Sequence, residues 1–518
     1  MSTTRFRAKL AVLVWLSVAS LEGAAASDVP LIEAAQRGDT DQVRALLEGN
    51  ADPNAAEPDG TTALHWAVRQ NDAGMARLLI ASGASIDAVT RYGVAPIYFA
   101  ALNGNRETLE LLLEAGAAAD WANPGGETLL MTAARTGRVD AVDLLLGRGA
   151  EVDRRENVRG QTALMWAVLE DHPDVVRLLL SNGADVDART DIDMPQGMEA
   201  SITRRDGTRA TSGDIGAHGP GIYRPRAIPS PSGAMSPLSF AAREGNLDMA
   251  RLLVESGADV DLPSANGTPP ITVATINNHI GLALYLLEQG ADPNLADDYH
   301  ARTPLFAAVE MRNLDFTRET APPYPDAREP MELIEALVEA GANPNARTHT
   351  TPARGFMQGT ASWVSFDGQT PFIRAALAGD ITLMRLLLDY GADPNLETYE
   401  GSTALMAAAG VNWVVGQTYS RSDEEYLEAA RLCLELGADA NAANSQGFTP
   451  MHGATNRGFD EMVRLLFDHG AALEVEDSQG RTPMTFAEGV FLAVQPPVYK
   501  PETIALIEEL LAVRAGEN

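Results

Sequence analysis

The residues able to do acid–base, nucleophilic or metal chemistry are few in this chain and form no known catalytic set. The 518-residue sequence holds one cysteine and eight histidines. Cys433 stands in "RLCLELGAD", where sister segments have leucine, so we expect a buried structural thiol and not a nucleophile. The sequence lacks G-x-S-x-G, H-E-x-x-H, the Walker A motif and paired C-x-x-C. We therefore predict no catalytic residue and a chain that is not an enzyme.

Metal chemistry is equally weakly supported. Asp214 and His218 share one irregular stretch, but a single carboxylate and a single imidazole are too few ligands for a site. His172 and His469 each follow an aspartate, yet adjacent residues on a helix do not face each other. The recurring "ADVD" and "ADPN" turns supply too few oxygens for calcium, and we expect their side chains to bond local backbone. We predict neither a metal nor a cofactor.

Charge and the first residues limit the partners and the location. The formal net charge of −32 would repel phosphate, so nucleic acid is an unsuitable partner, while a protein with a basic face is favoured. Arg5, Arg7 and Lys9 precede an apolar run at 10–19 and then "EGAAAS", which predicts a secretory signal peptide over 1–26. An uncleaved anchor is the alternative. The run is too short for a permanent membrane span, so we expect an exported chain, periplasmic or secreted, with no membrane insertion after cleavage.

The elements that carry these residues repeat along the chain. A glycine that opens "GAD" or a variant of it recurs, often at intervals of 33 residues, and this period is typical of a repeat protein. The positions are Gly83, Gly116, Gly149, Gly183, Gly257, Gly290, Gly341, Gly391, Gly437 and Gly470. Longer intervals equal one unit plus an insert.

Each unit has the same physical logic. It opens with "GxTxL", where Thr62, Thr162 and Thr449 are placed to cap the start of a helix. A short alanine-containing helix follows, then a second helix with a leucine-rich face. The ruler glycine suits the left-handed position after the second helix, and a polar turn leads to the next unit. One such unit cannot bury its apolar face alone, so we expect the units to stack.

The unit resembles the ankyrin repeat, on its period, its "T-P-L-H"-type start and its glycine ruler. The resemblance implies a mainly α solenoid of about 11–12 helix-turn-helix units with short hairpin loops, which we expect to form a single domain over 27–518. It also implies structural hydrogen bonds between repeats from His65 and His452, and binding of other proteins. Ala301 in place of the opening glycine and Pro269 in place of threonine depart from the pattern and could distort single hairpins.

Four long inserts interrupt the predicted solenoid, at about 190–232, 313–329, 347–366 and 411–425. The first and third follow a completed second helix, which places them at the hairpin edge. The second and fourth fall between the two helices of one unit, at the opposite edge. Arginines and aromatics in inserts favour binding contacts. We expect partner-binding residues at Arg204, Arg205, Tyr223, Arg224, Arg226, Arg354, Phe356, Trp363, Trp413 and Tyr419.

These inserts have three open interpretations: flexible tails, docking on the chain's own acidic solenoid, or direct contact with a partner. Trp66 and Trp166 occupy equivalent positions, and we expect both to pack in the core, with exposure on the concave face as the alternative.

The predicted function is a non-catalytic protein–protein interaction module or scaffold in the cell envelope, monomeric alone, that binds through its concave face and inserts. The alternatives are a small-ligand or peptide-binding receptor, with a closed cavity under the inserts, and an enzyme with a site between inserts.

Overall fold

The computed structural model describes residues 29–194, 230–313, 329–349, 367–411, 421–490 and 497–516. The predicted signal peptide at 1–26 lies outside these residues. The chain divides into two compact units, residues 1–118 and 119–518, and each is described by itself. The expectation of one domain over 27–518 therefore stays a prediction.

The described residues of the first unit form three helix pairs. They are α1 (Val29–Gln36) with α2 (Thr40–Glu48), α3 (Ala63–Arg69) with α4 (Ala73–Ala81), and α5 (Pro96–Asn103) with α6 (Arg106–Glu114). The first helices pack on one another, α1 on α3 and α3 on α5, and the second helices do the same.

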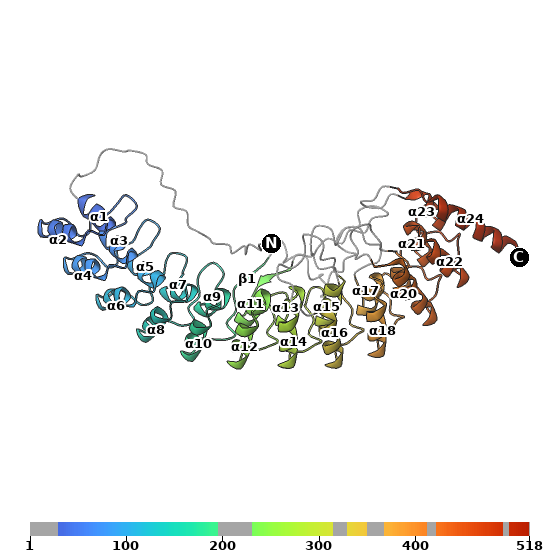
Figure 1. The fold of residues 1–518 in the computed structure, drawn as a ribbon, viewed down its shortest axis with the longest axis horizontal. Helices are drawn as coiled ribbons and strands as arrows, with labels where there is room; N and C mark the ends of the chain where they lie inside the picture. The colour runs from blue at the N-terminus through green and yellow to red at the C-terminus, as the bar shows by residue number, and fades with distance from the viewer. Residues whose placement is uncertain are drawn as a thin grey trace, which may run out of the picture. The chain divides into compact units, whose positions relative to one another are not determined.

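The second unit, taken by itself, has the same arrangement in nine helix pairs of its described residues. The first helices of the pairs are α7 (Leu129–Arg135), α9 (Ala163–Leu169), α11 (Pro237–Glu244), α13 (Pro270–Ile276), α15 (Pro304–Arg312), α17 (Pro371–Leu377), α19 (Ala404–Ala408), α21 (Pro450–Arg457) and α23 (Pro483–Gly489). The second helices are α8 (Val139–Gly147), α10 (Pro173–Ser181), α12 (Leu247–Glu255), α14 (Ile280–Glu288), α16 (Pro330–Glu339), α18 (Ile381–Asp389), α20 (Asp423–Glu435), α22 (Asp460–Asp468) and α24 (Pro501–Gly516). From α7 to α16 the first helices lie in one row and the second helices in another (Figure 1). The predicted mainly α solenoid of 11–12 units is confirmed.

Local signals in the sequence explain where these helices begin. Thr128 Oγ1 accepts the backbone N–H of Met131 at 3.1 Å and so caps α7. Asn246 caps the second helix α12 in the same way, with Oδ1 3.0 Å from the N–H of Met249. Proline stands in the first turn of many first helices, where its missing N–H costs nothing.

The core lies between the repeats. Ala133, Ala134 and Ala167 of the first helices are fully buried, and their small side chains let α7 approach α9 closely. Leu145 and Leu179 of the second helices are also fully buried. Each pair thus buries its apolar faces on its neighbours, which is how a repeat protein is stabilised.

Side-chain hydrogen bonds join the polar turns of successive repeats. Asp187 Oδ1 accepts the backbone N–H of Asp259 in the next turn at 3.0 Å. Asn294 accepts the N–H of Asn343 at 2.7 Å and also donates its Nδ2 to the carbonyl of Gly341 at 3.0 Å. We call this series the turn ladder, and it continues through Asp153, Asp261, Asn345 and Asn441. The expected local bonds are present as well, but the contact to the next repeat was not predicted.

A closed stem lies at the base of the first insert. Thr190 N–H donates to the carbonyl of Met235 at 3.1 Å, and Met235 N–H donates to Thr190 Oγ1 at 2.9 Å. Strands β1 (Ile192–Asp193) and β2 (Ser232–Gly233) then pair antiparallel, with Ile192 opposite Gly233. On the far side of this stem α9 packs on α11 and α10 on α12, so the stack continues across the insert.

The third insert begins and ends in the same way. Thr348 N–H donates to the carbonyl of Gln369 at 3.0 Å, and Gly368 N–H donates to the carbonyl of Thr348 at 2.7 Å. In the sequence the second insert instead lies between α15 and α16, and the fourth lies between α19 and α20.

The fourth insert is shorter than predicted. Helix α20 begins at Asp423, inside the expected range 411–425, because Ser422 and Glu425 form a capping box. The two departures from the repeat pattern leave their helices in place. Ala301 takes the left-handed backbone of the glycine it replaces, at φ 48°, and Pro269 holds the extended capping position before α13.

Candidate functional site

A half-buried aromatic residue stands four positions after the helix-capping residue in several first helices. In the first unit these are Trp66 in α3 and Phe99 in α5. The exposed guanidinium of Arg69 lies between the two rings, with Cζ 5.1 Å from the Trp66 centroid and 5.9 Å from the Phe99 centroid. Such cation–π contacts orient a guanidinium without neutralising it.

The second unit repeats this arrangement with residues from neighbouring helices. Trp166 of α9 is half-buried, and Cζ of Arg135 from α7 lies 5.7 Å from its ring centroid. Arg135 also forms an ion pair with Glu127, at 3.0 Å between Nη2 and Oε1. The Thr132 hydroxyl donates to the same Glu127 oxygen at 3.1 Å.

Helix α11 holds a related pair, in which the aromatic ring is buried. Cζ of Arg243 lies 5.1 Å from the ring centroid of Phe240 in the same helix, and the Arg243 side chain is exposed. We define an aromatic–arginine row in each unit by itself: Trp66, Arg69 and Phe99 in the first unit, and Arg135, Trp166, Phe240 and Arg243 in the second.

The carbonyl groups of the row's arginines are bound by the following repeat. His172 Nε2 lies 3.1 Å from the carbonyl of Arg135, and His279 Nε2 lies 3.1 Å from that of Arg243. In the first unit Asn103 Nδ2 donates to the carbonyl of Arg69 at 3.1 Å. These bonds fix the end of each first helix and therefore the backbone position from which each arginine side chain extends. This role of His172 was not predicted.

The expectation that Trp66 and Trp166 are core residues is wrong in part, because both rings are only half-buried. A recurring signal could have revealed the row. Arg69, Arg135 and Arg243 each stand seven positions after the residue that caps their helix. Two stand three positions after an aromatic residue, one helical turn away, where side chains meet.

The row has the chemistry of recognition and not of catalysis. Arginine stays charged at all physiological pH values and offers five N–H donors, so it can bind carboxylates and carbonyl oxygens but cannot act as an acid or base there. Arginine and tryptophan are also the residues that most often contribute large binding energies at protein interfaces.

The histidines at the "T-P-L-H" position are structural. His65 Nδ1 accepts the N–H of Thr62 at 3.1 Å, so the ring proton is on Nε2, which donates to the carbonyl of Val94 at 3.0 Å in the next repeat. His452 makes the equivalent bonds to Thr449 and Arg481. Burial lowers the pKa of both rings, which keeps them neutral. The role implied by the resemblance is confirmed.

The single cysteine is a poor candidate for nucleophilic chemistry. Burial raises the pKa of the Cys433 thiol to about 12, and its side chain is buried, so it is a poor nucleophile. Within the described ranges no cluster of three or more histidine, cysteine, aspartate or glutamate residues could hold a metal ion.

The predicted partner-binding residues of the inserts all lie outside the described residues. They are Arg204, Arg205, Tyr223, Arg224, Arg226, Arg354, Phe356, Trp363, Trp413 and Tyr419. Asp214 and His218, considered as metal ligands, lie outside them too. These assignments stay predictions.

The chain belongs to the ankyrin repeat family. The family pattern described as "Ankyrin repeats (3 copies)" matches residues 31–123, 97–190, 238–319, 327–415 and 420–490, which together make up more than half of the chain. Ankyrin repeats generally mediate protein–protein interaction, and the fold is typically non-catalytic.

Individual relatives are similar over part of their length. An ankyrin repeat-containing protein of Treponema pallidum is 28% identical over 161 residues, which are 31% of this chain and 43% of that protein. An L-asparaginase of Dirofilaria immitis is 27% identical over 229 residues, 44% of this chain and 30% of that enzyme. This chain thus spans less than half of either relative. The solved ankyrin repeat domain of human ASB11 aligns with 51% of this chain and 99% of its own, at 22% identity and a TM-score of 0.39.

No helix in the described part of the chain has both the length and the apolar character needed to span a bilayer.

Proposed function

We propose that this chain is a non-catalytic binding protein of the cell envelope that holds a protein partner on the first helices of its units. The aromatic–arginine row carries this proposal. Three arginine side chains contact aromatic rings, and side chains of the following repeat bond the backbone carbonyls of the same arginines. Arg69 and Arg243 are exposed, while Arg135 and Arg243 also pair with Glu127 and Glu244. Preorganised arginines lose little freedom on binding, which favours affinity.

The partner would present carboxylate or carbonyl oxygens to these arginines within a face that is basic overall, since the chain carries a net charge of −32. The binding protein itself would be a monomer. The predicted insert residues would add contacts at the edges of the first-helix face.

The central test compares two triple variants with the same change of charge. Arg69→Gln, Arg135→Gln and Arg243→Gln together remove the row's cations but keep its rings. Arg77→Gln, Arg177→Gln and Arg251→Gln remove three arginines from the second helices α4, α10 and α12. A partner is first captured by crosslinking in cells that make the protein, and its Kd is then measured with the purified variants.

We expect the first triple variant to bind about 100-fold more weakly, at about 1 kcal/mol for each interface arginine, and the control to bind normally. Equal affinity of both variants, or equal loss in both, would overturn the proposal.

The contribution of the first insert is tested separately. Deletion of residues 195–229 keeps the stem formed by Thr190 and Met235, so a loss of binding would report on the insert and not on the stack.

Export is tested on protein made in its own host. We expect the mature chain to begin at Ser27, and an N-terminus at Met1 would contradict cleavage.

A further inference from the structure

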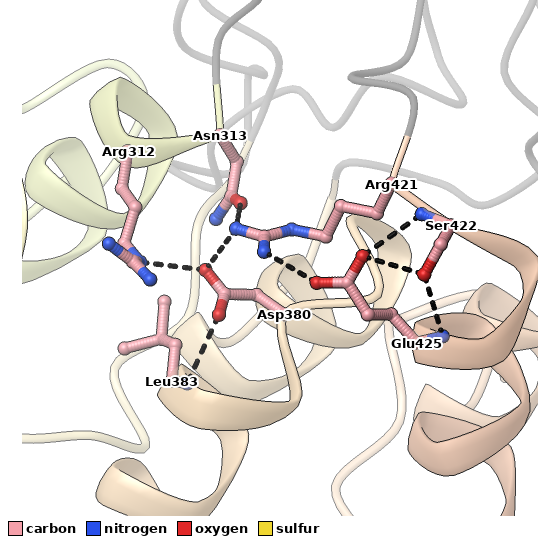
Figure 2. A network of polar contacts seen from close by, with 7 residues as sticks. All are labelled: Arg312, Asn313, Asp380, Leu383, Arg421, Ser422 and Glu425. Atoms are coloured by element: carbon pink, nitrogen blue, oxygen red, sulfur yellow. Dashed lines mark hydrogen bonds and ion pairs between the residues drawn. The ribbon is translucent and has the colours of Figure 1, made fainter.

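One buried carboxylate lies between two repeats that carry inserts. Asp380 caps the start of α18, where its Oδ1 accepts the N–H of Leu383 at 3.2 Å, and its side chain is fully buried. Arg312, at the end of α15, donates Nε to Asp380 Oδ2 at 2.7 Å. Arg421, just before α20, donates Nη2 to the same oxygen at 2.8 Å, as Figure 2 shows.

The boundaries of the second and fourth inserts also contact each other directly. Asn313 is the last described residue before the second insert, and Arg421 is the first described residue after the fourth. Arg421 Nη2 lies 3.3 Å from Asn313 Oδ1, although the two residues are 108 positions apart. Asn313 is itself buried, and its Nδ2 donates to the carbonyl of Val309 in α15 at 3.0 Å.

Arg421 extends the connection into the next helix. Its Nη1 lies 3.1 Å from Glu425 Oε1, and the other oxygen of Glu425 accepts the N–H of Ser422 at 2.9 Å (Figure 2). Ser422 Oγ in turn accepts the N–H of Glu425 at 3.3 Å, which completes the capping box of α20. The end of α15 and the start of α20 are therefore joined through Asp380.

The equivalent position elsewhere makes a simpler contact. Asp380 stands ten residues after the capping residue Thr370, as His172 stands ten residues after Thr162. His172 bonds one backbone carbonyl of the preceding repeat. Asp380 instead binds side chains from both the preceding and the following repeat. This two-sided contact occurs where both neighbouring repeats carry an insert between their helices.

We infer that Asp380 is a shared anchor that couples the two inserts, so that a change at the boundary of one alters the order of the boundary of the other. The anchor works because a buried carboxylate with two arginine partners is strongly favoured over one left unpaired. Loss of either arginine leaves the other with a changed partner, and this links Arg312 energetically to the start of α20.

Hydrogen exchange measured by mass spectrometry on the full chain tests this coupling. The amides of Ser422 and Glu425 report on the start of α20, and the amide of Asn313, bonded to the carbonyl of Glu310 at 3.1 Å, reports on the end of α15. Asp380→Asn should speed exchange at both places by about tenfold or more.

The decisive variant is Arg312→Gln, which we expect to speed exchange at Ser422 and Glu425 as well as at α15. Arg312→Lys keeps the charge and should restore part of the protection. Arg431→Gln removes an exposed pair within α20, with Glu424, and should leave Asn313 unchanged.

If Arg312→Gln changes α15 but leaves the start of α20 as it was, Asp380 holds two separate contacts and the coupling is refuted. The arginine variants decide the matter even if Asp380→Asn does not fold.

Discussion

Replacing Asp187 by asparagine should stabilise the turn ladder. Asp187 accepts the N–H of Asp259, as the asparagines of the ladder accept an N–H from the next turn. A carboxylate cannot donate, whereas Asn294 also donates to the carbonyl of Gly341 in the next turn. Asparagine at position 187 would have the matching carbonyl of Gly257 within reach.

The expected gain follows from one added hydrogen bond. A net contribution of about 0.5–1.5 kcal/mol is usual for such a bond, so we expect about 1 kcal/mol of local stability. Electrostatic repulsion of the Asp187 carboxylate also favours the asparagine variant. Burial, followed by the charges of Asp259 and Asp185, raises the pKa of Asp187 above its ordinary 3.8. Because the carboxyl is partly exposed, solvent screens this repulsion and we add nothing further for it.

The pH dependence has a definite sign. The pKa of Asp187 is higher in the folded chain than in the unfolded chain, so ionisation costs folding free energy at neutral pH. That cost disappears as the pH falls through the folded pKa and below the unfolded value of 3.8. The advantage of Asp187→Asn should therefore be largest near pH 7 and should shrink in acid.

Local hydrogen exchange is the suitable assay, since repeat proteins do not always unfold in one step. We expect exchange of the Asp259 amide to slow about fivefold in Asp187→Asn, the equivalent of about 1 kcal/mol. Asn294→Asp is the reciprocal control and should speed exchange at Asn343. The reasoning is refuted if neither variant changes exchange at pH 7, or if Asp187→Asn speeds it.

Two further predictions concern the last repeats. The pKa of His452 is below its ordinary 6.5, so stability should fall as the pH drops below about 6.5, where the unfolded chain takes up the proton first. Urea unfolding at pH 7 and pH 5 should show this fall, and His452→Gln should reduce it; an equal fall in the variant would contradict the assignment. Gly447→Ala should be more destabilising than Gly470→Ala, although both glycines have positive φ, of 78° and 84°. A Cβ at 447 would lie 2.8 Å from the Cα of Asp477, whereas nothing lies within 4 Å of one at 470, and equal urea midpoints would refute this difference.

Much of the fold could be predicted because its signals are local. A threonine that caps a helix and a glycine that follows one act within a few residues, and they recur at a fixed period. The helices also form in the repeats that depart from the pattern, since Ala301 adopts the left-handed backbone at φ 48°. The predicted end of the fourth insert, at 425, is too late, because Ser422 and Glu425 form a capping box that starts α20 at Asp423. This signal is local too, but it was not part of the prediction.

The candidate site was harder to predict because its contacts join different repeats. Arg135 and Trp166 belong to separate helices, and the period alone does not tell which side of a first helix faces solvent. Asp380 has the sequence of an ordinary helix cap, yet its arginine partners lie 68 and 41 positions away. The predicted binding residues lie in the inserts, whereas the aromatic–arginine residues lie on regular helices.

The stem at Thr190 and Met235 gives this chain a place where its length can change over evolutionary time. The repeats on either side are already in register through that stem, so residues added or lost between Met194 and Ser230 do not shift any helix of the stack. A new recognition segment can arise there by simple insertion, and a protein engineer can graft a foreign loop at the same place.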